Sequence, residues 1–64
     1  MPIYRMEVFG APDDRLRERR NIQASDDAEA IRIATDIYDT LAARAALSGY
    51  VLYDGERVVH EGKK

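Results

Sequence analysis

Apolar residues recur at every second position near both ends of the chain and at every third or fourth position in its middle. Residues 2–9 and 50–61 alternate, whereas residues 26–47 follow a helical period. A spacing of two places side chains on one face of a strand, and a spacing near 3.6 places them on one face of a helix. The change of period therefore predicts strands at both ends of the chain around one amphipathic helix.

The first half of the chain predicts two strands joined by a turn. The first strand is expected over residues 3–9, and the turn over residues 10–14, where Pro12 is followed by two aspartates. The second strand is expected from about residue 16 to residue 24, and charges that interrupt its apolar face are typical of a sheet edge. The apolar faces are Tyr4, Met6 and Val8 on the first strand and Leu16, Ile22 and Ala24 on the second.

The helix has a clear start signal. Asp26 lies three residues before Glu29, which is the spacing of a capping box, and Ser25 is a second candidate for the cap. Gly49 after Ser48 predicts the C-terminal end. Small residues in the middle of the apolar stripe would let the helix approach a sheet closely. The stripe consists of Ala30, Ala34, Leu41 and Ala45, flanked by Ile31, Ile33, Ile37 and Tyr38.

The last part of the chain predicts a hairpin. Asp54-Gly55 separates strands expected over 50–53 and 57–61, and favours a type I′ turn, in which both central residues have positive φ. The sequence leaves open whether the loop has two residues or more. Residues 62–64 are expected to form a frayed tail. The side chains expected to face the helix are Tyr50, Leu52 and Val59.

The resulting order, β-β-α-β-β, predicts a two-layer α+β domain that comprises residues 1–64. One amphipathic helix covers one face of a four-stranded antiparallel sheet. The opposite face has no second helix to cover it, and the sequence does not specify the strand order.

Composition limits the possible reinforcements and locations. The chain has 64 residues, a net charge of −2, no cysteine and one histidine. A domain of this size buries only about 60% of the surface of its unfolded chain, and such domains often rely on disulfides, metal ions or oligomerisation. Without cysteine the chain can form neither a disulfide nor a thiolate metal site, and one histidine cannot form a His-rich metal site. Oligomerisation is the reinforcement that remains. No apolar run approaches the ~20 residues of a membrane span, and the first residues show no signal-peptide pattern. We therefore expect no membrane association and a cytoplasmic location.

Few residues suggest catalysis. His60 is the only side chain whose ordinary pKa lies near neutrality, and its neighbour Glu61 is expected on the opposite face of the strand. Asp36 and Asp39 could share a hard cation, but ion pairs of Arg32 with Asp36 and Glu29 on the helix surface account for most of these charges more simply. There is no glycine-rich phosphate loop and no Ser-His-Asp set. We expect neither an enzyme nor a cofactor.

Two kinds of partner remain. The uncovered sheet face would bind a second copy of the chain or another protein, and this is the leading prediction. The alternative is nucleic acid bound by an arginine-bearing β-ribbon, on which Arg17 and Arg19 are expected to share a face. Flanking aspartates and the lack of interleaved aromatic residues weigh against that alternative. The expected protein contacts are Ile3, Phe9, Val51, Tyr53 and Val58, and the expected nucleic-acid contacts are Arg5, Arg15, Arg17, Arg19 and Arg20.

Three segments of the chain together resemble a group of very small bacterial proteins that share a domain of unknown function. The segments are residues 1–8 (MPIYRMEV), 24–30 (ASDDAEA) and 53–59 (YDGERVV). The resemblance implies a stand-alone bacterial protein and the same β-β-α-β-β pattern. It contributes no activity and no site residue.

Overall fold

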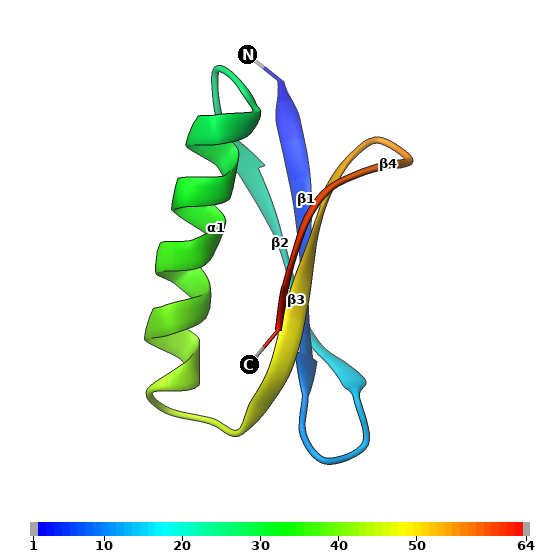
Figure 1. Ribbon diagram of the computed structural model, residues 1–64, viewed down its shortest axis with the longest axis vertical. Coiled ribbons are helices and arrows are strands. Elements are labelled where there is room, and N and C mark those ends of the chain that lie inside the picture. The colour runs from blue at the N-terminus through cyan, green and yellow to red at the C-terminus, as the bar shows by residue number, and fades with distance from the viewer. Residues whose placement is uncertain (1, 64) are drawn as a thin grey trace.

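A computed structural model describes the backbone of residues 2–63 and the side chains of residues 2–62. The elements are β1 (Ile3–Gly10), β2 (Arg15–Gln23), α1 (Asp27–Ala42), β3 (Leu47–Asp54) and β4 (Arg57–Lys63). They form a four-stranded antiparallel sheet with α1 packed on one face (Figure 1). The predicted order and the two-layer α+β architecture are confirmed.

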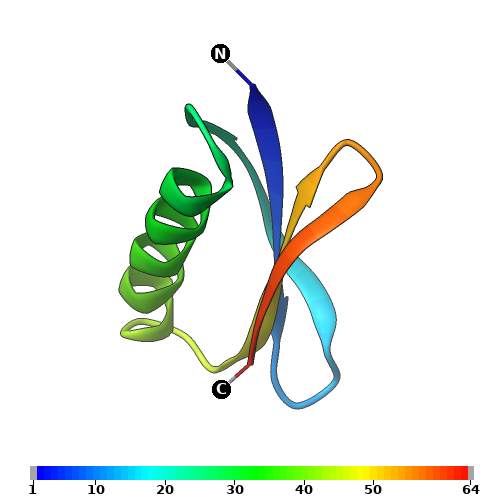
Figure 2. The ribbon, with the colours of Figure 1, turned by 45° about the horizontal axis from the view of Figure 1, so that its top comes forward.

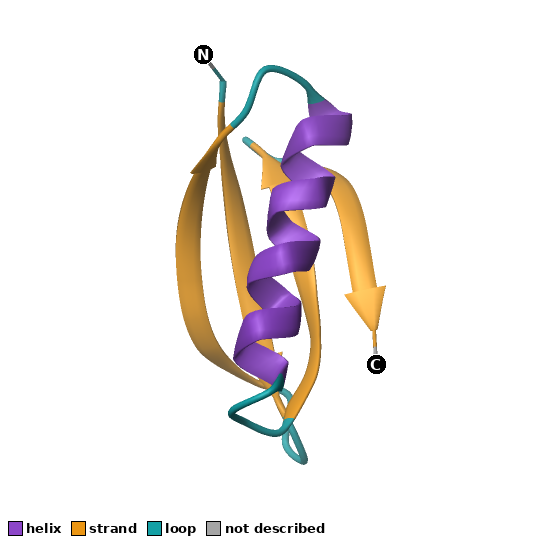
Figure 3. Cartoon of the chain, turned by 90° about the vertical axis from the view of Figure 1, so that its left-hand side faces the viewer, coloured by secondary structure: helices purple, strands orange, loops and turns teal. Residues whose placement is uncertain are grey.

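The strand order in the sheet is β2-β1-β3-β4. The first strand therefore lies in the interior of the sheet, paired with its hairpin partner β2 on one side and with β3 on the other. The helix carries the chain from the edge strand β2 across the sheet to β3, and it lies in front of the strands in Figure 3. Pairing of β1 with β3 unites the two ends of the sequence in one sheet.

The core lies between α1 and the sheet. The helix contributes two fully buried alanines, Ala30 and Ala34, so its backbone comes close to the strands, as the small residues predict. The larger residues beside them, Ile31, Ile33, Ile37 and Leu41, are partly buried and pack against the core. The buried strand residues are Tyr4, Met6, Val8, Ile22, Leu47, Tyr50 and Leu52, and Val59 packs against them. The predicted helix-facing residues are thus confirmed, with Leu16 and Ala45 as exceptions.

The helix begins where the sequence predicts. The Asp26 side chain accepts a hydrogen bond of 2.9 Å from the backbone N–H of Glu29. The Glu29 carboxylate accepts one of 2.8 Å from the backbone N–H of Ser25. In a capping box the second donor is the N–H of the cap residue, whereas here it is the N–H of Ser25, the residue before the cap. The N–H groups of Glu29 and Ser25 are nevertheless satisfied in the reciprocal manner of a capping box.

The prediction that the helix continues to Ser48-Gly49 is wrong. The helix ends at Ala42, and β3 begins at Leu47, which pairs with Gly10. Residues 43–46 carry the chain from the helix to the sheet. Ala45, expected on the apolar stripe, is therefore exposed. Sheet pairing determines this boundary, because β3 must reach the end of β1.

The C-terminal hairpin forms as predicted, with a loop of two residues. Asp54 pairs with Arg57, so the loop consists of Gly55 and Glu56, and only Gly55 has a positive φ, of 65°. A type I′ turn needs positive φ at both central residues, so that prediction is wrong. The expectation of a frayed tail is also wrong for Gly62, which pairs with Tyr50. Lys64 lies outside the described residues.

An irregularity in β2 changes which side chains share a face. Glu18 pairs with Val8 and Leu16 pairs with Phe9, so Arg17 has no direct partner on β1. The extra residue moves Leu16 to the face opposite that of Ile22. The prediction that Leu16 and Ile22 share a face is therefore wrong.

Candidate functional site

The face of the sheet opposite α1, called the uncovered face below, is built from all four strands. No helix of the described chain lies over it (Figure 2). Register places its side chains in rows that run across the strands in the order β2, β1, β3, β4. One row is Asn21, Arg5, Tyr53 and Val58, the middle row is Arg19, Glu7, Val51 and Glu61, and the third contains Leu16, Phe9 and Gly49.

The uncovered face gathers exposed apolar side chains. Ile3, Leu16 and Val58 are the exposed large hydrophobic residues of the described chain, at 56%, 46% and 49% exposure, and all three lie on this face. Phe9, Val51 and Tyr53 are half-buried there. The five residues expected to contact a protein are thus brought together on one face. Sequence reasoning missed Leu16, because only the irregularity at Arg17 brings it there.

Charges on the uncovered face are partly neutralised within the chain. The Glu7 carboxylate lies 3.3 Å from the Nε atoms of both Arg5 and Arg19, and its side chain is only 16% exposed. The Arg5 guanidinium also lies over the Tyr53 ring, 4.5 Å from its centroid, as a cation–π pair. One carboxylate between two guanidinium groups leaves one positive charge at this side of the sheet.

The structure does not place the five predicted nucleic-acid contacts on one surface. Arg19 contacts Glu7 on the uncovered face, whereas Arg17 lies against Gly10 on the helix side. The prediction that Arg17 and Arg19 share a face is therefore wrong, because the extra residue in β2 separates them.

Each of these arginines also has a carboxylate partner. Arg15 and Arg17 lie 3.2 Å and 3.5 Å from the Asp13 oxygens. Arg20 pairs with Glu18 beside α1. The arginine side chains remain between 44% and 79% exposed. A phosphate group would therefore reach them only in competition with neighbouring carboxylates.

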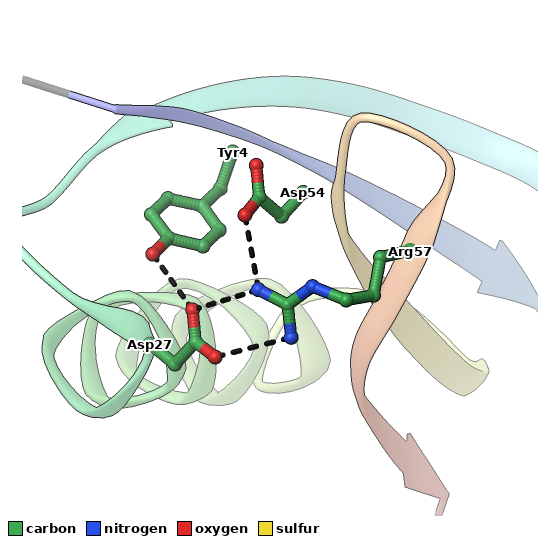
Figure 4. A network of polar contacts seen from close by, with 4 residues as sticks. All are labelled: Tyr4, Asp27, Asp54 and Arg57. Atoms are coloured by element: carbon green, nitrogen blue, oxygen red, sulfur yellow. Dashed lines mark hydrogen bonds and ion pairs between the residues drawn. The ribbon is translucent and has the colours of Figure 1, made fainter.

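A second cluster joins β1, the start of α1 and the β3–β4 hairpin (Figure 4). The Tyr4 hydroxyl donates a hydrogen bond of 2.8 Å to Asp27 Oδ1. The Arg57 guanidinium donates to both Asp27 oxygens at 3.2 Å and to Asp54 Oδ2 at 2.9 Å. The hydrogen bond to Asp27, together with burial, raises the pKa of Tyr4 to about 12. Bonds from Arg57 and Tyr4 lower the pKa of Asp27.

These pKa shifts point to a structural role for the cluster. A tyrosine with a raised pKa stays protonated near neutral pH, and a carboxylate with three donors is a weak base. The cluster instead holds the first turn of α1 against the sheet. Sequence reasoning treated Tyr4 as core and Asp27 as a helix-start residue. The available signal was that a buried phenol needs a hydrogen-bond partner.

The other candidate catalytic residues are separated. The His60 ring lies 6.0 Å from the Tyr50 ring, whereas Glu61 pairs with Val51 on the opposite face. Asp36 lies 3.7 Å from Arg32, as expected of a helix-surface ion pair. Within residues 2–63 no group of three or more His, Cys, Asp or Glu side chains could hold a metal ion.

Two open grooves lie on the surface. One, of about 210 Å³, lies between α1 and β2 and is lined by Arg20, Asp36, Ile37, Thr40 and Leu41. The other, of about 370 Å³, opens beside Gly49 and is lined partly by Phe9, Val51 and Glu61 of the uncovered face. The larger groove thus adjoins the apolar residues described above.

Comparison of the chain with protein-family models, with curated proteins and with solved structures found no match. The resemblance to small bacterial proteins therefore stays a prediction. Among the described residues, no helix is long and apolar enough to cross a membrane.

Proposed function

We propose that this protein is a non-enzymatic self-association module that forms a homodimer through the uncovered face. The observation that carries the proposal is the distribution of Ile3, Leu16 and Val58. These exposed large hydrophobic residues come from three different strands, and all of them lie on the one sheet face that the helix leaves open. Exposed apolar patches of this kind mark interaction surfaces.

A second copy of the chain is the partner that the small size favours. A domain of 64 residues buries little apolar surface by itself, and without cysteine it cannot be reinforced by a disulfide. Association with a second copy adds buried apolar surface. Face-to-face packing of two sheets would cover the apolar residues of both copies and form a four-layer assembly with a helix on each outer side. The charges of the face also favour self-association, because Glu7 already neutralises one of its two neighbouring arginines.

The proposal is tested by measuring the mass of the protein in solution. Light scattering at micromolar concentration should give about twice the 7.3 kDa of one chain. Val58→Glu should shift the protein toward monomer, because it adds a charge to the apolar patch. This variant should remain folded, since Val58 is 49% exposed.

A matched control adds the same charge elsewhere. Ala28→Glu places a carboxylate at an exposed position of α1, away from the uncovered face. This control should retain the dimer mass. A wild-type protein that is strictly monomeric at micromolar concentration would contradict the proposal.

Nucleic-acid binding is the alternative function, and the exposure of the arginine side chains favours it. It predicts affinity that falls with salt, with a slope that decreases when Arg17 and Arg19 are changed to alanine. Absence of binding to duplex and single strands at low salt would exclude it. We place it second, because neighbouring carboxylates already engage these arginines.

A further inference from the structure

We propose that the two copies are related by a two-fold axis that runs along the strands, so that Arg19 of each copy faces Glu61 of the partner subunit. Phe9 of each copy then enters the groove beside the partner's Gly49. This inference rests on the proposed self-association and specifies its geometry.

The register of the sheet leads to this pairing. Arg19 pairs with Glu7, Glu7 with Val51, and Val51 with Glu61, so these residues form one straight row across the uncovered face. The row begins on one edge strand, β2, and ends on the other, β4. A two-fold rotation about an axis along the strands places β2 over β4 of the partner and keeps each row in place. Arg19 therefore meets the partner's Glu61 at both edges.

The charges distinguish this axis from the other simple choice. A two-fold axis across the strands, through the same row, would place Arg19 over the partner's Arg19 and Glu61 over the partner's Glu61. Like charges facing each other disfavour such a complex, whereas opposite charges favour it. The cluster of Arg5, Glu7 and Arg19 has one unbalanced positive charge, which an exposed Glu61 can match. The uncovered face is thus complementary to itself only in the first arrangement.

The shape of the face agrees with the same axis. Phe9 and Gly49 are direct partners in another row, on β1 and β3. Rotation about the strand direction places Phe9 over the partner's Gly49, where a groove of about 370 Å³ is open and no side chain projects from the glycine. Aromatic side chains in such pockets commonly dominate interface affinity. Packed sheets are rotated by about 30° relative to each other, which shifts the edge strands of the two copies out of direct alignment. The long side chain of Arg19 can span this shift.

Charge reversal in two separate variants tests the axis. Arg19→Glu alone and Glu61→Arg alone should each weaken the homodimer by roughly tenfold or more, because two like-charged contacts replace two opposite ones. When the two variants are mixed, the heterodimer regains both opposite-charge contacts. Its affinity should therefore return toward that of the wild-type dimer. Arg32→Glu, on the exposed side of α1, is the control for the charge change and should leave the affinity unaltered.

The mixing step separates assembly from folding. Arg19→Glu also places a second carboxylate beside Glu7, and any loss of fold caused by this change would persist in the mixture. Analytical ultracentrifugation with one variant fluorescently labelled measures the heterodimer directly. A wild-type dimer with no preferential heterodimer formation would overturn the axis and leave self-association intact. A monomeric wild type would overturn both proposals.

Discussion

Replacing Gly62 with alanine tests how firmly the end of the chain is held in the sheet. A Cβ atom at Gly62 would lie 2.7 Å from Cζ of Tyr50 and closer still to Cε1 of the same ring. This ring cannot move aside freely. It lies 4.9 Å from the Tyr38 ring, its hydroxyl is 2.9 Å from Thr35 Oγ1, and the residue is only 5% exposed.

Two opposing effects determine the change in the free energy of unfolding. Alanine in place of glycine in a strand normally contributes about 0.5–1 kcal/mol of stability through backbone entropy. Overpacking of a buried ring costs about 1–3 kcal/mol. The difference between those effects spans about 0–2.5 kcal/mol, and we therefore expect Gly62→Ala to be destabilising by roughly 1 kcal/mol. That is a large share of the roughly 3–10 kcal/mol expected for 64 residues.

Thermal unfolding followed by circular dichroism at one protein concentration measures the effect. The expected fall in Tm is about 4–8 °C for each kcal/mol. Gly10→Ala is the matched control, since its Cβ would meet the Arg17 side chain, which is about half exposed and can rotate into water. This control should leave stability unchanged or raise it by up to about 1 kcal/mol, because the backbone-entropy gain is not opposed by a buried ring. Equal shifts for the two variants, or a more stable Gly62→Ala protein, would refute the reasoning.

Four further predictions concern hydrogen bonds, their pH dependence and the helix cap. The Tyr38 hydroxyl is buried without a hydrogen-bond partner among the described residues, so Tyr38→Phe should keep or raise Tm. Tyr50→Phe should lower the free energy of unfolding by about 1 kcal/mol, because it loses the hydrogen bond to Thr35. Equal shifts in Tm for the two variants would contradict this reasoning. The lowered pKa of Asp27 means that its contribution to the free energy of unfolding is complete above pH 3.8 and is lost as the pH falls through the lower folded-state pKa. Urea unfolding measured at a series of pH values should therefore show a smaller loss of stability in acid for Asp27→Asn than for the wild type. The raised pKa of Tyr4 means that its contribution to the free energy of unfolding is present below pH 10 and is lost as the pH rises through about 12. In the same measurements, Tyr4→Phe should remove this loss of stability at alkaline pH. Asp26→Ala removes the helix cap and should cost about 1 kcal/mol in urea unfolding, and an unchanged midpoint would argue against the cap.

The apolar periods of the chain predicted the elements and most of their inner faces. Alternation over the first strand identified Tyr4, Met6 and Val8 as buried, and the helical spacing identified Ala30 and Ala34. These predictions depend on side-chain direction within a single element, which is a local property. The helix start was predictable for the same reason, because a cap forms between residues three or four apart in sequence.

The candidate site could be predicted only in part. The sequence indicated that one sheet face would lack a cover, and it named five apolar residues for that face. It did not indicate Leu16, because the unpaired residue Arg17 moves the side chains that precede it in β2 to the opposite face of the sheet. The partners of the arginines were also unpredictable, since Arg19 and Glu7 meet through strand pairing.

The sequence by itself determined the type and order of the elements, where the helix begins, and which side chains of most elements point inward. Tertiary structure decided that β1 lies inside the sheet, that the helix ends at Ala42, and that Tyr4, Asp27 and Arg57 form one cluster. The physical reason is that the first group depends on spacing along a single segment. The second group depends on hydrogen bonds and contacts between segments far apart in the chain, and no local pattern specifies which of those segments pair.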